Sequence, residues 1–286
     1  MKNKKLREIK NKLSLDNYNS LNDFIFFKYL CEKGNEKQQR TFLEALGIII
    51  KDDFKIKNQK IAPEIIGNKT CILDFIAEDG NNTIINIELQ LQNTKDFKNR
   101  LIYYLCRLMI DSLNKGENYN KIKKIIVIAI VNFNMNKSPY YHNVYRLINE
   151  KDKINDKFTF KLEIHIIELK KFREIKKDLT NKEHLYLTFI DNETTHNKRK
   201  ELVKMDEGLK AAIEKIEEAV QDREALRVYH LIEMERMKIE NQIEEGMEKG
   251  KKEGIIEVAT NFKKIGISIE DIAKATGLSK DTIEKL

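Results

Sequence analysis

The sequence predicts an α/β protein with a mixed sheet, on three observations: a hairpin pattern, a change to helical periodicity directly after it, and two later apolar strands. The order of hairpin, helix and strand along the chain favours a core of helices packed on a sheet. With 41% hydrophobic residues among 286, the chain has enough apolar side chains for one such core.

The hairpin is predicted from two apolar, partly β-branched segments, residues 71–77 and 83–91, which flank the turn-forming sequence Asp-Gly-Asn-Asn. Helical spacing follows, and the helix is expected to end before Gly116. The residues that show this spacing are Leu101, Tyr104, Leu105, Leu108 and Met109. Residues 125–131 then predict a fully buried strand, and residues 162–169 an alternating one.

Short helices are expected before the hairpin, and the chain after the core is expected to contain helices and no strands. Apolar spacing between Asp23 and Leu46 predicts two short helices, broken near Gly34 and closed at Gly47. The core is expected to end near Ile190.

Residues 200–257 predict a long charged helical arm, through which the chain could form a homodimer. Within it Gly246, Gly250 and Gly254 share one helix face. Residues 258–286 predict a small helix-turn-helix-like tail with a capping box at Ser268. Two interpretations of this tail stay open: a DNA-reading module, or a small docking or capping bundle.

Composition and motifs exclude several classes of protein. The longest apolar run is far too short to cross a membrane, and the amino terminus lacks the apolar segment of a secretion signal. Three scattered cysteines indicate neither a disulfide framework nor a zinc site, so we expect a cytoplasmic location. No phosphate-binding loop is present, and no nucleotide cofactor is expected. The net charge of +7 permits a polyanionic partner, although a Lys- and Asn-rich composition can also arise without selection for one.

Polar residues inside the apolar hairpin predict the functional site. If the hairpin pairs about Asn81, Asp74 lies directly opposite Glu88, and Asn86 and Gln90 share the face of Glu88. Two carboxylates so close repel each other unless a cation neutralises them, and Mg²⁺ prefers oxygen ligands. The spacing alone leaves two interpretations open: a metal site for phosphodiester hydrolysis, or an exposed sheet face with solvated carboxylates.

The same residues carry a resemblance to a known family. Asp74, then Glu88-Leu89-Gln90 on the next strand and a helix, resembles the PD-(D/E)XK nuclease superfamily, whose pattern is Asp, a hairpin and Asp/Glu-x-Lys. More narrowly, the chain resembles the recombination-promoting nuclease and transposase family (Rpn type), in which Glu-x-Gln commonly replaces Glu-x-Lys. The supporting segments are Phe27-Lys28, LDF, IELQ, Arg100 with Tyr103-Tyr104, Gly116 with Tyr119, the strand from Ile125, EGMEKGKKEG and GLSKDTIEKL.

The resemblance implies a restriction-endonuclease-like core over residues 15–190, with a mixed sheet flanked by helices, and a Mg²⁺-dependent DNA endonuclease linked to recombination or transposition. It implies that Asp74 and Glu88 bind the metal ion and that Gln90 stands where the family usually has Lys. Glu64 resembles the acidic residue that such nucleases often place upstream. Arg100 is a candidate for binding phosphate.

Gln90 is the departure from the superfamily pattern that matters chemically. Its amide can orient a water molecule, but it carries no positive charge for the transition state. Lys95, Lys98 or Arg100 from the following helix could supply that charge. The alternative is a catalytically inert DNA-binding or interaction protein that keeps the nuclease fold.

Overall fold

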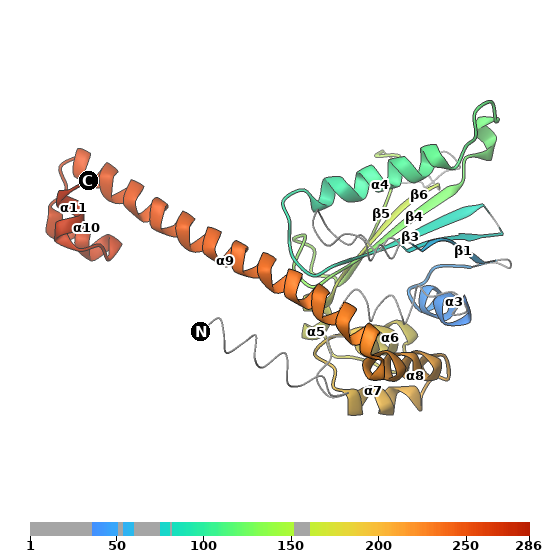
Figure 1. Ribbon diagram of the computed structural model, residues 1–286. Coiled ribbons are helices and arrows are strands. Elements are labelled where there is room, and N and C mark those ends of the chain that lie inside the picture. Colours follow the sequence, from blue (N-terminus) through green and yellow to red (C-terminus); the bar gives the residue numbers. More distant parts are fainter. Residues whose placement is uncertain (1–35, 51–53, 60–74, 81, 152–160) are drawn as a thin grey trace. The chain divides into compact units, whose positions relative to one another are not determined.

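The computed structural model describes residues 36–50, 54–59, 75–80, 82–151 and 161–286. The chain divides into two compact units, Met1–Ile232 and Glu233–Leu286. The first contains a six-stranded sheet with helices on both faces (Figure 1). The second is helical.

The sheet is mixed, as predicted, and its strand order is β1-β2-β3-β4-β6-β5. Three central strands, β3, β4 and β6, run parallel, and the remaining neighbours pair antiparallel. The strands are β1 (Lys55–Gln59), β2 (Phe75–Asp79), β3 (Thr83–Gln90), β4 (Lys124–Val131), β5 (His142–Arg146) and β6 (Leu162–Glu168).

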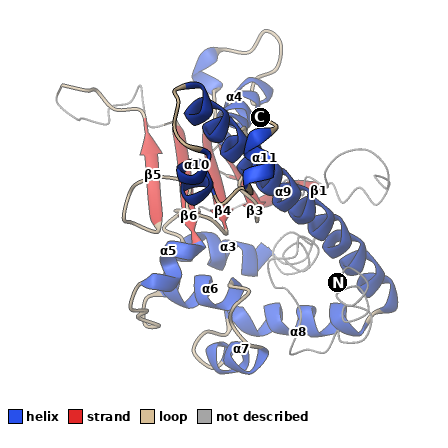
Figure 2. Cartoon of the chain, turned by 90° about the vertical axis from the view of Figure 1, so that its left-hand side faces the viewer, coloured by secondary structure: helices blue, strands red, loops and turns tan. Residues whose placement is uncertain are grey.

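Helices cover both faces of the sheet, and each face has its own apolar cluster. Ile85 and Ile87 of β3 belong to a large cluster with α3, α6 and α8, whereas Ile84 belongs to a smaller cluster with α4. Figure 2, turned by 90°, shows the strands above α3, α6 and α8. The helices of this unit are α3 (Glu36–Ala45), α4 (Phe97–Asp111), η2 (Tyr119–Lys121), α5 (Leu169–Glu174), α6 (Lys182–Ile190), α7 (His196–Val203) and α8 (Gly208–Gln221).

The hairpin has the predicted register. Phe75 pairs with Ile87 and Ala77 with Ile85, so the pairing is centred on residue 81, and Asn82 in the turn has a φ of +59°. The predicted helix is α4, and the two predicted apolar strands are β4 and β6.

The elements before the hairpin are described only in part. The second of the two short amino-terminal helices is α3, which Gly47 closes with a φ of +80°. The first lies outside the described residues.

The arm predicted over residues 200–257 differs from the structure in its first part. Residues of α7 and α8 belong to the main core, because the apolar stripe of α8 packs in the same cluster as α3 and α6. Leu202, Leu209 and Ile216 are buried there. A helical period predicts an apolar stripe but not which surface covers it, so the sequence could not assign these helices to the core.

The long helix α9 (Arg223–Lys264) follows, and its carboxyl-terminal part belongs to the second unit with α10 (Ile269–Thr276) and α11 (Lys280–Glu284). Ala259, Ile272 and Ile283 form the small core of this unit. The predicted cap is present, since Ser268 Oγ accepts a hydrogen bond from the Asp271 N–H at 3.2 Å. Across the described ranges, no helix combines the length and apolar character needed to span a bilayer.

A chain of hydrogen bonds through two histidines holds the edge strand β5. His142 Nε2 lies 2.9 Å from His165 Nδ1, and His142 Nδ1 lies 2.6 Å from Glu183 Oε1. His165 Nε2 lies 3.4 Å from Glu163 Oε2. Burial lowers the pKa of His165, because the charged imidazolium loses more hydration than the neutral ring. His165 therefore takes up a proton more readily in the unfolded chain than in the folded one.

The substitution His165→Gln should make the protein less sensitive to mild acid. Since the folded pKa of His165 lies below its ordinary value of 6.5, the unfolded state binds more protons as the pH falls below about 6.5, and wild-type stability decreases there. Between pH 7.5 and 5.5 the melting temperature should fall further in the wild type than in the variant. The extra fall should be about 2–4 °C for each kcal/mol by which the free energy of unfolding decreases. Thermal melts by circular dichroism measure this, and parallel pH curves would contradict it.

Candidate active site at the end of strand β3

A polar stripe runs along one face of β3, inside an otherwise apolar strand. Asn86, Glu88 and Gln90 alternate with Ile87 and Leu89, which pack in the large cluster on the opposite face. This alternation confirms which residues of β3 face together. The stripe lies on the α4 side, in line with Ile84 of the smaller cluster.

Glu88 is a buried carboxylate, only 6% exposed. Its Oε1 accepts a hydrogen bond from Asn86 Nδ2 at 3.1 Å, and Asn86 is itself 2% exposed. The neighbour of Glu88 on β4 is Ala129. A buried carboxylate on a polar stripe is a group that could bind a cation.

Gln90, at the carboxyl end of β3, is linked to helix α4. Its Oε1 accepts a hydrogen bond from Arg100 Nη2 at 2.5 Å, and its Nε2 donates to the Gln92 carbonyl at 2.8 Å. The Arg100 guanidinium also lies over the ring of Phe97, 5.0 Å from its centroid. The structure thus brings two predicted residues, Gln90 and Arg100, into direct contact.

Among the described residues, the buried polar atoms without a hydrogen-bond partner include three in this region: Asn86 Oδ1, Arg100 Nε and Asn132 Oδ1. Asn132 directly follows β4, and its N–H donates to the Gln90 carbonyl at 3.1 Å. Buried polar atoms without partners cost about 1–3 kcal/mol each, so they mark a place where a ligand, an ion or a water molecule completes the hydrogen bonds. Sequence reasoning did not single out Asn132, although a polar residue directly after a buried parallel strand is a recognisable signal.

The remaining predicted site residues are placed as follows. Asp74 and Glu64 lie outside the described residues. Lys95 and Lys98 are exposed and, within the described part of the chain, have no hydrogen bond or ion pair. Of the three cations considered for the site, only Arg100 contacts the polar stripe.

Glu88 and Asn86 offer oxygen atoms, the ligand type that Mg²⁺ prefers. Asn86 Oδ1 is buried and unpartnered, which fits a group that could complete the coordination of a cation. Among the described residues no three His, Cys, Asp or Glu side chains gather as a metal-binding group.

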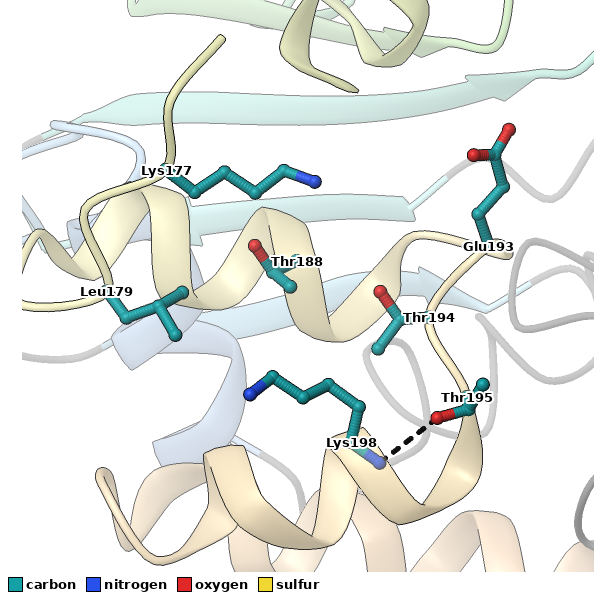
Figure 3. A pocket seen from close by; sticks show the side chains of 7 residues that line it. All are labelled: Lys177, Leu179, Thr188, Glu193, Thr194, Thr195 and Lys198. Atoms are coloured by element: carbon teal, nitrogen blue, oxygen red, sulfur yellow. Dashed lines mark hydrogen bonds between the residues drawn. The ribbon is translucent and has the colours of Figure 1, made fainter. Parts of the chain in front are cut away.

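A separate pocket of about 370 Å³ lies among α5, α6 and α7, and no residue of the polar stripe lines it (Figure 3). Thr195 caps α7 there and accepts a hydrogen bond from the Lys198 N–H at 3.2 Å. The lining residues are Lys177, Leu179, Thr188, Glu193, Thr194, Thr195 and Lys198.

Comparison with protein families adds to this geometry. A family model described as "PD-(D/E)XK nuclease family transposase" matches residues 20–253. The chain belongs to this family. The predicted family is therefore confirmed, and the mixed sheet flanked by helices agrees with the restriction-endonuclease-like fold predicted for it. No curated protein and no solved structure matches the chain.

Membership of this nuclease family points to a hydrolase that acts on nucleic acid. The matched residues include the whole polar stripe, Arg100 and the carboxyl-terminal helices as far as residue 253 of α9. They end before α10 and α11, so the tail lies outside the match.

Proposed function

We propose that the protein is a Mg²⁺-dependent DNA endonuclease linked to recombination or transposition, with its site at the carboxyl end of β3. The observation that carries this proposal is the buried Glu88 carboxylate, which Asn86 holds beside Gln90 and Arg100. The nuclease family to which the chain belongs supports the same chemistry.

Asp74 is the proposed second metal ligand. The described pairs of the hairpin end at Phe75 with Ile87. The register predicted from the sequence sets Asp74 opposite Glu88. Directly opposed residues share a face, with Cβ atoms about 5 Å apart. Glu64 is proposed as a further acidic residue of the site.

The chemistry divides between the ion and the chain. A bound Mg²⁺ ion would lower the pKa of a water molecule and neutralise charge on the phosphate. Glu88 and Asp74 would hold the ion, and Asn86 fixes the orientation of the Glu88 carboxylate. Gln90 and Arg100 lie beside this site, joined by a hydrogen bond.

Cleavage of supercoiled plasmid DNA in 5–10 mM Mg²⁺, a concentration on the order needed to saturate a site of one or two carboxylates, tests the proposal. Glu88→Ala should slow nicking by about 100-fold or more, because the site loses its buried ligand. Glu174→Gln, which removes one exposed carboxylate at the end of α5, is the matched control and should cut like the wild type.

The alternative function, a catalytically inert DNA-binding protein with the nuclease fold, rests on Gln90 in the usual place of Lys. Under that alternative neither the wild type nor Glu88→Ala cuts, while both bind DNA. That result with Mn²⁺ as well as Mg²⁺ would refute nuclease activity.

Metal binding gives a second test that does not depend on cleavage. Ca²⁺ at about 100 times its dissociation constant should stabilise the wild type by about 2.7 kcal/mol, measured as a rise in melting temperature. Glu88→Gln should lose this rise. Asn86→Leu, which keeps the size but removes the donor to Glu88, should weaken Ca²⁺ binding by about 10–100-fold. Equal rises in all three proteins would contradict a cation at Glu88.

A homodimer through α9 is a further part of the proposal, since two sites could then nick both strands. Exposed Met247, Ile256 and Val258, together with the open glycine face at Gly250, support an interface there. Light scattering of the full chain should give twice the monomer mass of 33.7 kDa, and Gly250→Arg should give the monomer. A monomeric wild type at micromolar concentration would overturn the dimer.

The cellular setting is proposed on chemical grounds. The exposed thiol of Cys106 suits a reducing compartment, and DNA is the substrate of the proposed reaction, so we place the protein in the cytoplasm.

A further inference from the structure

Arg100 is a partly buried cation that forms no salt bridge within the described part of the chain, although its charge helps to lower the pKa of the exposed Asp96 carboxylate. Within the described part of the chain no carboxylate lies within 4 Å of its guanidinium, and its Nε is buried without a hydrogen-bond partner. Three other sheltered cations of the same unit have an acidic partner: Lys124 with Glu163 at 2.7 Å, Lys171 with Glu168 at 2.7 Å, and Arg173 with Asp191 at 2.6 Å. A guanidinium beside a buried polar stripe, with no carboxylate within 4 Å among the described residues, is suited to an anion that comes from outside the protein.

The guanidinium is held in place before any anion arrives. Phe97, which is buried, supports it from one side, and Phe97 in turn packs edge-to-face on Phe133 at 6.1 Å. Gln90 Oε1 fixes one nitrogen at 2.5 Å. A fixed cation needs little reorganisation when charge develops nearby, which is the condition for strong electrostatic stabilisation.

The orientation of the Gln90 amide follows from its two hydrogen bonds. Its oxygen faces the Arg100 donor, and its nitrogen faces the Gln92 carbonyl. The flipped amide would set donor against donor and carbonyl against carbonyl, so only one orientation is compatible with both neighbours. The Gln90 oxygen is therefore already engaged, and the amide has one further N–H to offer to the site.

We propose that Arg100 binds the oxygens of the phosphodiester that is cleaved, and that Gln90 is the positioning residue that aims it. The inference rests on the proposed function. Arg100, aimed by Gln90, supplies the positive charge that a lysine at position 90 would supply alone. Because a guanidinium stays protonated at any physiological pH, Arg100 acts as a charge and a donor and exchanges no proton with the substrate.

The test measures kcat and KM for cleavage of a labelled duplex by a set of variants. Arg100→Ala should lower kcat by about 100-fold, the loss expected for one preorganised donor in a transition state. Gln90→Leu should lower kcat by about 10-fold. In the Arg100→Ala background, Gln90→Leu should change kcat by less than about 3-fold, because Gln90 acts through Arg100.

Two further variants separate a functional charge from a structural side chain. Arg107→Ala removes the same charge from an exposed position on α4 and should keep wild-type kcat. The double variant Gln90→Lys/Arg100→Ala moves the charge to position 90, and it should recover at least about 10-fold over Arg100→Ala. A side chain that only supports α4 would show no such recovery, so the recovery distinguishes the two roles.

The outcomes separate this inference from the proposed function. If the wild type cuts and Arg100→Ala stays within about 3-fold of it, the nuclease stands and the role of Arg100 is overturned. If the wild type does not cut, the affinity for the same duplex is measured in Ca²⁺ by fluorescence anisotropy, and this affinity decides whether Arg100 contacts phosphate. A contact without cleavage is supported if Arg100→Ala binds more weakly and its slope of log affinity against log salt is reduced by about 0.9. Unchanged binding refutes the contact.

Discussion

The burial of strand β3 on both faces is the constraint on which the rest of the site depends. One face carries Ile85 and Ile87 into the large cluster, and the other carries Asn86 and Glu88 under α4. Polar side chains in such a place lose water and must bond to each other or to a ligand. The hydrogen bond from Asn86 to Glu88 meets only part of this need, because Asn86 Oδ1 has no partner.

Helix α4 links the packing of the sheet to the chemistry of the site. Phe97 and Leu101 bury its inner face against the strands, and this packing sets where Arg100 emerges beside Gln90. Each of the three polar atoms that have no partner among the described residues lowers the free energy of unfolding by about 1–3 kcal/mol, which is large beside a net stability of about 5–15 kcal/mol for a domain. The burial of the large apolar cluster on the opposite face raises the free energy of unfolding and so offsets this loss.

The hairpin register and the facing of β3 could be predicted from the sequence, because strand alternation and a turn centred on Asn81 leave little freedom. The sequence could not predict which cation contacts Gln90, because Lys95, Lys98 and Arg100 all lie near the start of α4. The choice depends on the rotation of α4 about its own axis, which Phe97 and Phe133 fix by packing. Likewise, the apolar stripe of α8 was recognisable, but its burial in the main core depends on contacts with α3 far away in the chain.

The tail over residues 258–286 can be judged on the same grounds. Helix α11 has five residues and so extends about 7.5 Å, less than two turns, which gives it few side chains that could reach base edges in the major groove. Residues 258–286 contain four carboxylates and five lysines, a near balance that attracts phosphate only weakly. Ile272 and Ile283 instead close a small core with Ala259 of α9. These features favour the docking or capping bundle over a DNA-reading module.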